Sequence, residues 1–275
     1  MRAIFYVNFW SSICLSLAAT LLPAQTLAAA FDHQHNGFTA VLKQQVRWNA
    51  EGTATAVNYA ALKAQPAALN AYTASLSKIT AAELKSFSKA QRRAFLINAY
   101  NAFTVQLILS KYPDLKSIKD LGGVFSSPWK KSFVPLLGRT ISLDEIEHTL
   151  IRGAADFDDP RIHFAVNCAS IGCPALRDEA YTADKLDAQL FDQTQRFLKD
   201  RSRNYFNAKN NTLNLSMIFK WYGSDFERGF LNAKSVVEFV ANYGTSLALT
   251  KAQEQAIKSG TVDLEYTEYD WLLNK

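Results

Sequence analysis

The sequence predicts an α+β fold, a helix-rich single domain around a small antiparallel sheet. Two observations predict this class. The short β-type runs come mostly as hairpins, and helical patterns cluster before and between these hairpins. A doubly wound parallel sheet would require strands and helices in regular alternation, and this chain has no such alternation. We therefore expect neighbouring strands to pair in the antiparallel sense.

The first half of the chain is expected to be helical. Residues 38–48 and 58–69 have apolar side chains at helical spacing, and residues 88–111 form the longest helical pattern. The long pattern ends before Pro113, because a proline disfavours helical geometry in the residue that precedes it. Six of its positions follow the three-to-four spacing of one helix face: Phe95, Ala99, Ala102, Phe103, Gln106 and Leu109. We therefore expect a central core helix here.

Shorter elements are expected in the second half. A hairpin is predicted around residues 137–139, and Ser142 then caps a helix, with Glu145 three residues on completing a capping box. Residues 162–166 are predicted to form a strand. The remaining predictions are a helix over 182–199, a hairpin around 209–211, helices near 224–242 and 251–259, and a last strand near 262–266.

The first thirty residues have the pattern of a secretory signal peptide. Arg2 opens a short basic region, residues 4–22 are mostly apolar, and residues 27–30 place small side chains at a cleavage position. A membrane anchor is the weaker interpretation, because polar residues interrupt the apolar stretch and the cleavage pattern follows it directly. We predict a signal peptide over 1–30 and a single globular domain over 31–275.

This interpretation sets the compartment and limits the partners. Export places the mature chain in the periplasm or outside the cell, with no stable membrane insertion after signal cleavage. Cleavage removes Arg2 and no acidic residue, so the net charge of +5 falls to +4. Because the basic residues are scattered among acidic ones, we expect no nucleic acid partner, and the expected partner is an unknown envelope peptide or protein. No cofactor is expected.

The segment 161–174, which reads RIHFAVNCASIGCP, carries most of the functional information. Its two cysteines, Cys168 and Cys173, are the only ones left once the signal peptide is removed. A thiol at a sheet edge or helix start has its pKa lowered by backbone N–H groups, which favours a nucleophile. An oxidising compartment favours a disulfide instead, and a loop containing Gly172 and followed by Pro174 allows the Cα atoms to approach within about 7 Å. Both interpretations stay open.

Two histidines in the body of the chain are candidate bases for such a thiol. His163 lies five residues before Cys168, and His148 is the second candidate. The other two, His33 and His35, lie in the expected flexible start of the mature chain. Both candidate bases precede the cysteine, which reverses the chain order of papain-like enzymes. The predicted fold class therefore includes a distant papain-like or transglutaminase-like arrangement with a rearranged order of site residues.

Glu147 falls inside the apolar stripe of its predicted helix, where an unpaired carboxylate is costly. In one interpretation it is a structural carboxylate that ties down an arginine such as Arg152 or Arg161. In the other, Glu147 orients the catalytic imidazole of His163. On an α-helix His148 points about 100° away from Glu147, so both side chains project into one site only if the helix is distorted.

Three asparagines and one histidine are candidate binding residues. Asn98 and Asn101 lie within the long predicted helix, where an asparagine lowers helix propensity and therefore satisfies a specific partner. They either bond a neighbouring loop backbone, which is the favoured role, or line a cleft beside Cys168. Asn167 is placed to donate a hydrogen bond to a developing oxyanion. His148 is the fourth candidate.

A zinc site is a third interpretation of the same segment. It would be built from His163, Cys168 and Cys173, with His148 or Glu147 as a further ligand. Two cysteines separated by four residues, with scattered histidines, are weak metal-ligand spacing. We therefore predict no metal site.

Five motifs along the mature chain carry a resemblance to a known family. They are VNYAALK at 57–63, FLINAYNAFT at 95–104, SLDEIEHTLIR at 142–152, DPRIHFAVNCASIGCP at 159–174 and YDWLLN at 269–274. By these motifs the chain resembles domain-of-unknown-function family 547. The resemblance implies an exported bacterial member of a family of bacterial envelope proteins and of plant proteins with an added leucine zipper. Asn58 departs from the aspartate expected in a VDYAALK-like segment, so the resemblance supports no role for an acid at that position.

Two functional hypotheses follow from these residues. The favoured one is an exported cysteine-dependent hydrolase or acyl-transferring enzyme that acts on amide or ester bonds of envelope peptides. Cys168 attacks the carbonyl, His163 takes the proton of the thiol, and Glu147 orients the imidazole. The alternative is a non-catalytic envelope binding or scaffold domain, in which Cys168 and Cys173 form a disulfide and the buried polar residues are struts.

Overall fold

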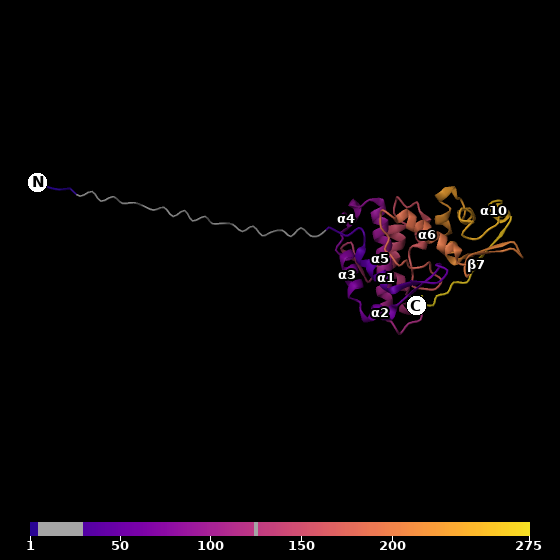
Figure 1. Ribbon diagram of the computed structural model, residues 1–275, viewed down its shortest axis with the longest axis horizontal. Coiled ribbons are helices and arrows are strands. Elements are labelled where there is room, and N and C mark those ends of the chain that lie inside the picture. The colour runs from indigo at the N-terminus through magenta and orange to yellow at the C-terminus, as the bar shows by residue number, and fades with distance from the viewer. Residues whose placement is uncertain (5–29, 124–125) are drawn as a thin grey trace. The chain divides into compact units, whose positions relative to one another are not determined.

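Helices dominate the fold (Figure 1). Helix α5 (Lys89–Leu109) is buried along most of its length from Ala94 onward. The structure is a computed structural model, and it describes residues 1–4, 30–123 and 126–275. Most of the predicted signal peptide lies outside the described residues. Ser88 begins α5 with a capping box, because its hydroxyl accepts from the backbone of Gln91 and the Gln91 side chain accepts from Ser88. The predicted central core helix is thus present.

The region before α5 is more broken than the sequence pattern indicates. Its elements are α1 (Asn36–Gln45), β1 (Val46–Trp48), β2 (Thr55–Val57), α2 (Tyr59–Ala64), α3 (Ala67–Ser77) and α4 (Ala81–Ser86). The helix predicted over 38–48 ends at Gln45 because the next three residues pair with β2 in an antiparallel ladder. The helix predicted over 58–69 is interrupted before Pro66, where Gln65 leaves helical geometry.

The predicted hairpin after α5 is present. Strands β3 (Val134–Leu136) and β4 (Arg139–Ile141) pair in the antiparallel sense. Leu137 and Gly138 join them, and both have positive φ, 56° and 76°. Positive φ at both central residues is what a two-residue type I′ turn requires. Two short 3₁₀ helices precede this hairpin: η1 (Ile118–Leu121) and η2 (Pro128–Lys130).

The helix after this hairpin, η3 (Glu145–Ile151), is a π-helix rather than an α-helix. The Ser142 hydroxyl accepts from the Glu145 backbone N–H at 3.1 Å, as predicted. The Glu145 carboxylate pairs with Arg139, so only half of the predicted capping box forms. At the other end, the Arg152 backbone N–H donates to the Glu147 carbonyl five residues back, at 2.9 Å. This wider winding is frequent at functional sites.

The strand predicted over 162–166 is wrong, because this segment contains a 3₁₀ helix, η4 (Pro160–Phe164). Asp159 caps the helix by accepting from the Arg161 backbone N–H at 3.0 Å, and Pro160 has the fixed φ that a first helical position favours. The alternation that suggested a strand is misleading, since every residue from 160 to 167 is buried. A helical turn packed on all sides gives the same apolar-rich run as a strand.

The C-terminal half confirms the α+β class. Its elements are α6 (Leu186–Lys199), β5 (Tyr205–Asn207), β6 (Thr212–Ser216), α7 (Met217–Trp221), α8 (Gly223–Phe226), η5 (Phe230–Asn232), α9 (Val236–Ala241), α10 (Lys251–Lys258) and β7 (Asp263–Thr267). The predicted β5–β6 hairpin is antiparallel, whereas β7 pairs with β6 in parallel. The three-stranded sheet is therefore mixed, and this pairing departs from the predicted antiparallel pattern.

Two hydrophobic clusters make up the core of the unit over Phe31–Lys275. One cluster is built around α1 to α5, and the other around α6 to α9 and the mixed sheet. Segment η4 contributes to both, because Ile162 packs in the first cluster and Phe164 in the second. Residues that follow η4 therefore lie where the two clusters meet. Among the described residues, no helix is both long and apolar enough to cross a membrane.

Candidate functional site

A cleft of about 310 Å³ brings together side chains from segments that are far apart in the sequence. Four of the predicted site residues line it, namely Glu147, His148, His163 and Cys168. The walls are strongly aromatic, and their aromatic members are Tyr100, Trp129, Trp221, Tyr222, Tyr269 and Trp271. Clefts of this size with apolar walls and a few convergent polar groups are typical of ligand sites.

The π-helical winding of η3 explains how Glu147 and His148 both reach the cleft. On an α-helix their directions would diverge by about 100°. The π-helix is the distortion that the sequence pattern required for both residues to share one site. Neighbouring Asp144 also lines the cleft, and its carboxylate lies 3.7 Å from Nε2 of His148.

His163 is held by Asp225, and the predicted pairing with Glu147 is wrong. Nε2 of His163 lies 2.8 Å from Oδ2 of Asp225, and the imidazole stacks on Tyr222 with ring centroids 3.9 Å apart. A carboxylate only accepts, so Nε2 carries the proton and Nδ1 bears the lone pair. Among the described residues, Nδ1 of His163 has no hydrogen-bond partner. Burial lowers the pKa of His163, although Asp225 opposes this shift.

Asp225, a fully buried carboxylate in α8, connects His163 with Arg152. Besides His163, it accepts from Nε of Arg152 at 2.6 Å. Arg152 in turn contacts Nδ1 of His148 at 2.8 Å through Nη1. Burial raises the pKa of Asp225, but the hydrogen bonds from His163 and Arg152 outweigh it and hold this pKa below its usual range.

Glu147 is only 5% exposed and makes no ion pair with any described residue. Its Oε1 accepts from the Tyr222 hydroxyl at 2.6 Å. The two arginines proposed as structural partners are engaged elsewhere, because Arg152 pairs with Asp225 and Arg161 pairs with Asp159 and Asp187. Burial, and then the Glu147 carboxylate, raise the pKa of Tyr222. The phenol therefore stays protonated and donates to Glu147.

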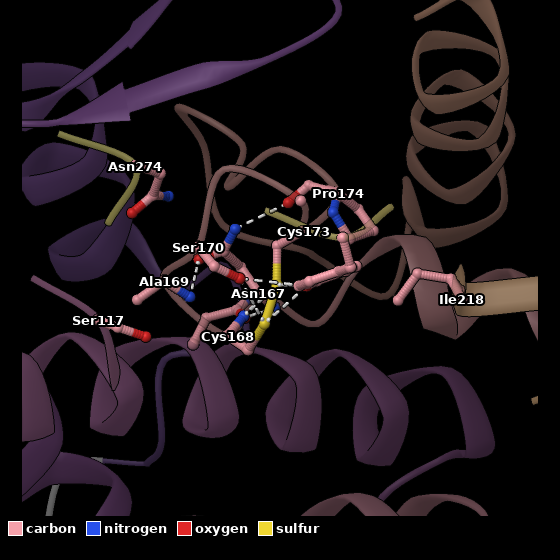
Figure 2. Close-up of a disulfide and its surroundings, with 12 residues drawn as sticks. Ser117, Asn167, Cys168, Ala169, Ser170, Cys173, Pro174, Ile218 and Asn274 are labelled. Atoms are coloured by element: carbon pink, nitrogen blue, oxygen red, sulfur yellow. Dashed lines mark hydrogen bonds between the residues drawn. A yellow bond between two sulfur atoms is a disulfide. The ribbon is translucent and has the colours of Figure 1, made fainter. Parts of the chain in front are cut away.

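Cys168 and Cys173 form a disulfide in the wall of the cleft, with their Cα atoms 6.1 Å apart (Figure 2). The Tyr269 hydroxyl lies 3.1 Å from each sulfur and 3.1 Å from the Ser170 hydroxyl. Cys168 is partly exposed, whereas Cys173 is buried. The disulfide leaves Cys168 without the thiol that the predicted nucleophile needs, so that role requires the reduced protein.

The C-terminal segment is clamped against the disulfide loop by backbone hydrogen bonds. The Gly172 N–H donates to the Asp270 carbonyl and the Ile171 N–H donates to the Leu272 carbonyl, both at 2.8 Å. A Cβ on Gly172 would lie 2.9 Å from the Asp270 carbonyl oxygen and from the Tyr269 ring. Glycine is therefore needed for this close approach, which places Tyr269 and its neighbours on the cleft wall.

The three candidate asparagines are structural struts and do not line this cleft. Asn98 accepts from the Tyr181 N–H and donates to its carbonyl, at 2.9 and 2.7 Å. Asn101 does the same for the Asn167 N–H and the Ala165 carbonyl, at 2.8 and 2.9 Å. Asn167 donates to the Pro174 carbonyl and accepts from Ala169 (Figure 2). These contacts match the structural role favoured for Asn98 and Asn101, whereas the Asn167 amide bonds backbone groups of its own loop instead of donating into the cleft.

Sequence reasoning did not identify Asp225, Tyr100, Tyr269 or Trp271 as site residues. Tyr269 and Trp271 fall in the YDWLLN motif, so that motif was a usable signal. Asp225 gave none, because an aspartate in a short helix is usually solvent-exposed. The segment around His33 and His35, expected to be flexible, also differs from expectation, since His35 is buried and contacts the Tyr72 hydroxyl at 2.8 Å.

The described residues contain no group of three or more His, Cys, Asp or Glu side chains arranged to hold a metal ion. The side chains considered from the sequence as zinc ligands are engaged with other partners. His163 uses Nε2 on Asp225, Glu147 accepts from Tyr222, and Cys168 is bonded to Cys173.

Comparison with known proteins finds a matching family, but the family has no described activity. Residues 84–198 match the model of a family described as "Protein of unknown function, DUF547". The matched region contains α5, η3, η4 and both cysteines, whereas Tyr222, Asp225 and the C-terminal segment lie beyond it. No curated protein matches the chain, and no solved structure matches it. Over residues 84–198, this chain therefore matches the DUF547 family.

Proposed function

We propose that this chain is an exported envelope binding domain whose ligand occupies the aromatic cleft. The observation that carries the proposal is the disulfide in the cleft wall, which bonds the sulfur that an enzyme mechanism would need. The remaining wall residues are suited to contact a ligand, because aromatic rings supply large apolar surfaces and buried polar groups fix the orientation of the ligand. The base candidate His163 has a side chain that is 0% exposed, so it is poorly placed to touch a substrate.

The binding proposal is tested with an array of defined tetrapeptides and oligosaccharides, probed with the mature, unreduced protein. Trp221 is 43% exposed and packs at a tilt against Tyr269 and Trp271 in the cleft. Trp221→Ala is expected to reduce retention at least tenfold, since it removes a contact surface at the cleft. Phe191→Ala is the matched control, because Phe191 is 46% exposed and lies outside the cleft. Equal retention by both variants and wild type would refute cleft binding.

The disulfide itself is tested by alkylation and intact mass measurement of the unreduced mature protein. We expect no alkylated cysteine before reduction and two after it. Replacing both cysteines by alanine is expected to lower the free energy of unfolding by about 2 kcal/mol, because the bond closes a short loop. Urea denaturation with and without a reductant measures this difference. A freely alkylated Cys168 in the native protein would contradict the binding proposal and favour the second candidate.

The second candidate is a cysteine-dependent hydrolase or acyl-transferring enzyme that is active only when reduced. The supporting observation is that Cys168 lines the cleft within 3.2 Å of the Ser170 hydroxyl and 3.1 Å of the Tyr269 hydroxyl. Donors of this kind stabilise a thiolate. Asp225, rather than Glu147, would orient His163 in this mechanism. Rapid alkylation of reduced Cys168 below neutral pH, together with ester hydrolysis lost in Cys168→Ala, would support it.

Export is part of the proposal and has its own test. We propose cleavage after Ala30, which gives a mature chain that begins at Phe31 in the periplasm or outside the cell. Mass measurement of the protein recovered from a bacterial periplasmic fraction is expected to give the mass of residues 31–275. Recovery of the uncleaved chain from the cytoplasm would contradict export.

A further inference from the structure

Glu147 is the least compensated charge in the cleft. Its carboxylate is 5% exposed, and its hydrogen bond from Tyr222 comes from a neutral hydroxyl. Buried carboxylates are ordinarily paired with a cation, because burial removes the water that would stabilise their charge. No lysine, arginine or histidine of the described residues forms an ion pair with it. The carboxylate therefore lacks a cationic partner among the described residues.

The other cleft charges do not supply that partner. Arg152 is committed to Asp225, which also receives Nε2 of His163. Asp144 adds a second carboxylate to the lining. The charged lining that remains available is thus acidic. Carboxylates without a cationic partner favour a ligand that brings positively charged N–H groups.

The aromatic walls favour the same kind of ligand. The face of an aromatic ring attracts a cation within about 6 Å of its centroid. One ring of the cleft already holds an ammonium of this chain, because Nζ of Lys119 lies 3.7 Å from the centroid of Trp271. Trp129 and Trp221 each lie within 6 Å of that ring, centroid to centroid.

We infer that the cleft binds an organic cation, whose ammonium or guanidinium group pairs with Glu147 between the aromatic rings. This inference rests on the proposed binding function and names the class of ligand. A lysine or arginine side chain, or a free amine of an envelope peptide, has this chemistry. The carboxylate gives the ligand a charge-assisted hydrogen bond, and the rings contact the apolar part of the ligand.

The probe is N-acetyl-lysine methylamide, and its neutral counterpart is N-acetyl-norleucine methylamide. Binding to the mature protein is followed by tryptophan fluorescence, because three tryptophans line the cleft. Saturable binding of the lysine probe is expected, with a Kd at least tenfold lower than that of the norleucine probe. Glu147→Gln is expected to weaken the lysine probe about tenfold to a hundredfold and to leave the norleucine probe unchanged.

Glu145→Gln is the matched control, because Glu145 lies on the same helix, pairs with Arg139 and is outside the cleft. It is expected to bind the lysine probe as the wild type does. Folding is checked by urea denaturation. Glu147→Gln is expected to keep or raise the midpoint, since it removes an uncompensated buried charge.

Three outcomes would overturn the inference. If the norleucine probe binds as tightly as the lysine probe and Trp221→Ala weakens both, the cleft binds ligands without selecting cations, and the proposed binding function survives. If neither probe binds, the cation inference fails, and the array experiment decides the binding function separately. If Glu147→Gln lowers the urea midpoint strongly, the carboxylate has a structural role and the inference fails.

Discussion

At the scale of single residues, Asp225 connects the two imidazoles that line the cleft. Its Oδ2 accepts from His163 and from Arg152, and Arg152 contacts His148. The Asp225 side chain is 0% exposed and that of Arg152 is 22% exposed. Removing the acid would leave a partly buried guanidinium without its carboxylate, which is more costly than losing a surface pair.

We predict that Asp225→Asn lowers the free energy of unfolding by about 3 kcal/mol. Urea denaturation at neutral pH measures the change. The control is Asp156→Asn, because Asp156 is a 41% exposed partner of Arg92 and its loss is expected to cost at most about 1 kcal/mol. Equal effects of the two variants would show that the buried pair contributes no more than a surface one.

Asp225 also shows what a local sequence pattern does not reveal. Glu147 was expected to orient His163 because a carboxylate inside an apolar helix stripe needs a partner, but the acid on His163 comes from 62 residues downstream. That pairing depends on the packing of α8 against the cleft, which no local spacing encodes. By contrast, the structural role of Asn98 and Asn101 was foreseen, because a buried amide within a helix must bond something specific.

At the scale of elements, the cleft is built from irregular pieces. A π-helix supplies Glu147 and His148, a 3₁₀ helix supplies His163, and a backbone-bonded loop supplies Cys168. Hairpins were predictable from turn residues, as at Gly138, because turn chemistry is local. The π-helix and the 3₁₀ helix were not, since periodicity assigns such short apolar runs to regular helices or strands.

Gly172 allows the C-terminal segment to pack on the disulfide loop, and its substitution tests that contact. Gly172→Ala is expected to lower the free energy of unfolding by about 1–3 kcal/mol, because the new Cβ lies 2.9 Å from backbone and ring atoms. A shift in the fluorescence of the cleft tryptophans is expected as well. Thermal and urea unfolding give the first quantity, and emission spectra give the second.

Gly37→Ala is the control for this prediction. Gly37 lies in the first turn of α1, and the nearest atom to a new Cβ is Cδ2 of Tyr72 at 4.0 Å. Alanine favours a helix over glycine, so a gain of up to about 1 kcal/mol is expected. If Gly172→Ala raised the free energy of unfolding as Gly37→Ala is expected to, the disulfide loop would tolerate a Cβ at position 172.

At the scale of the whole molecule, two hydrophobic clusters meet at η4, and the cleft lies beside this junction. A buried, neutral histidine lies at the edge of each cluster. His35 contacts Tyr72 in the first, and His163 precedes Phe164 of the second. The fold class followed from the order of hairpins and helices, but the division into two clusters depends on long-range packing that the sequence pattern did not indicate.

These two histidines make the stability of the folded protein depend on pH. Burial lowers the pKa of His35 to about 4, and burial also lowers the pKa of His163. In the unfolded chain both titrate near 6.5. At a pH between the folded and the unfolded pKa of each histidine, the unfolded chain binds a proton that the folded protein does not. The free energy of unfolding therefore falls as pH falls below about 6.5. Above that pH both states are neutral at these sites and the dependence disappears.

His35 alone is expected to contribute a loss of about 2 kcal/mol between pH 7 and pH 5, at about 1.4 kcal/mol per pH unit once the unfolded imidazole is protonated. His35→Asn should therefore have a shallower decline than wild type in urea midpoints measured across this range. Tyr72→Phe removes the hydroxyl that contacts His35 but keeps the imidazole, so its decline should remain steep. Parallel curves for His35→Asn and wild type would mean that the first cluster does not hold His35 neutral, and the pH dependence would then have to come from His163 and the carboxylates.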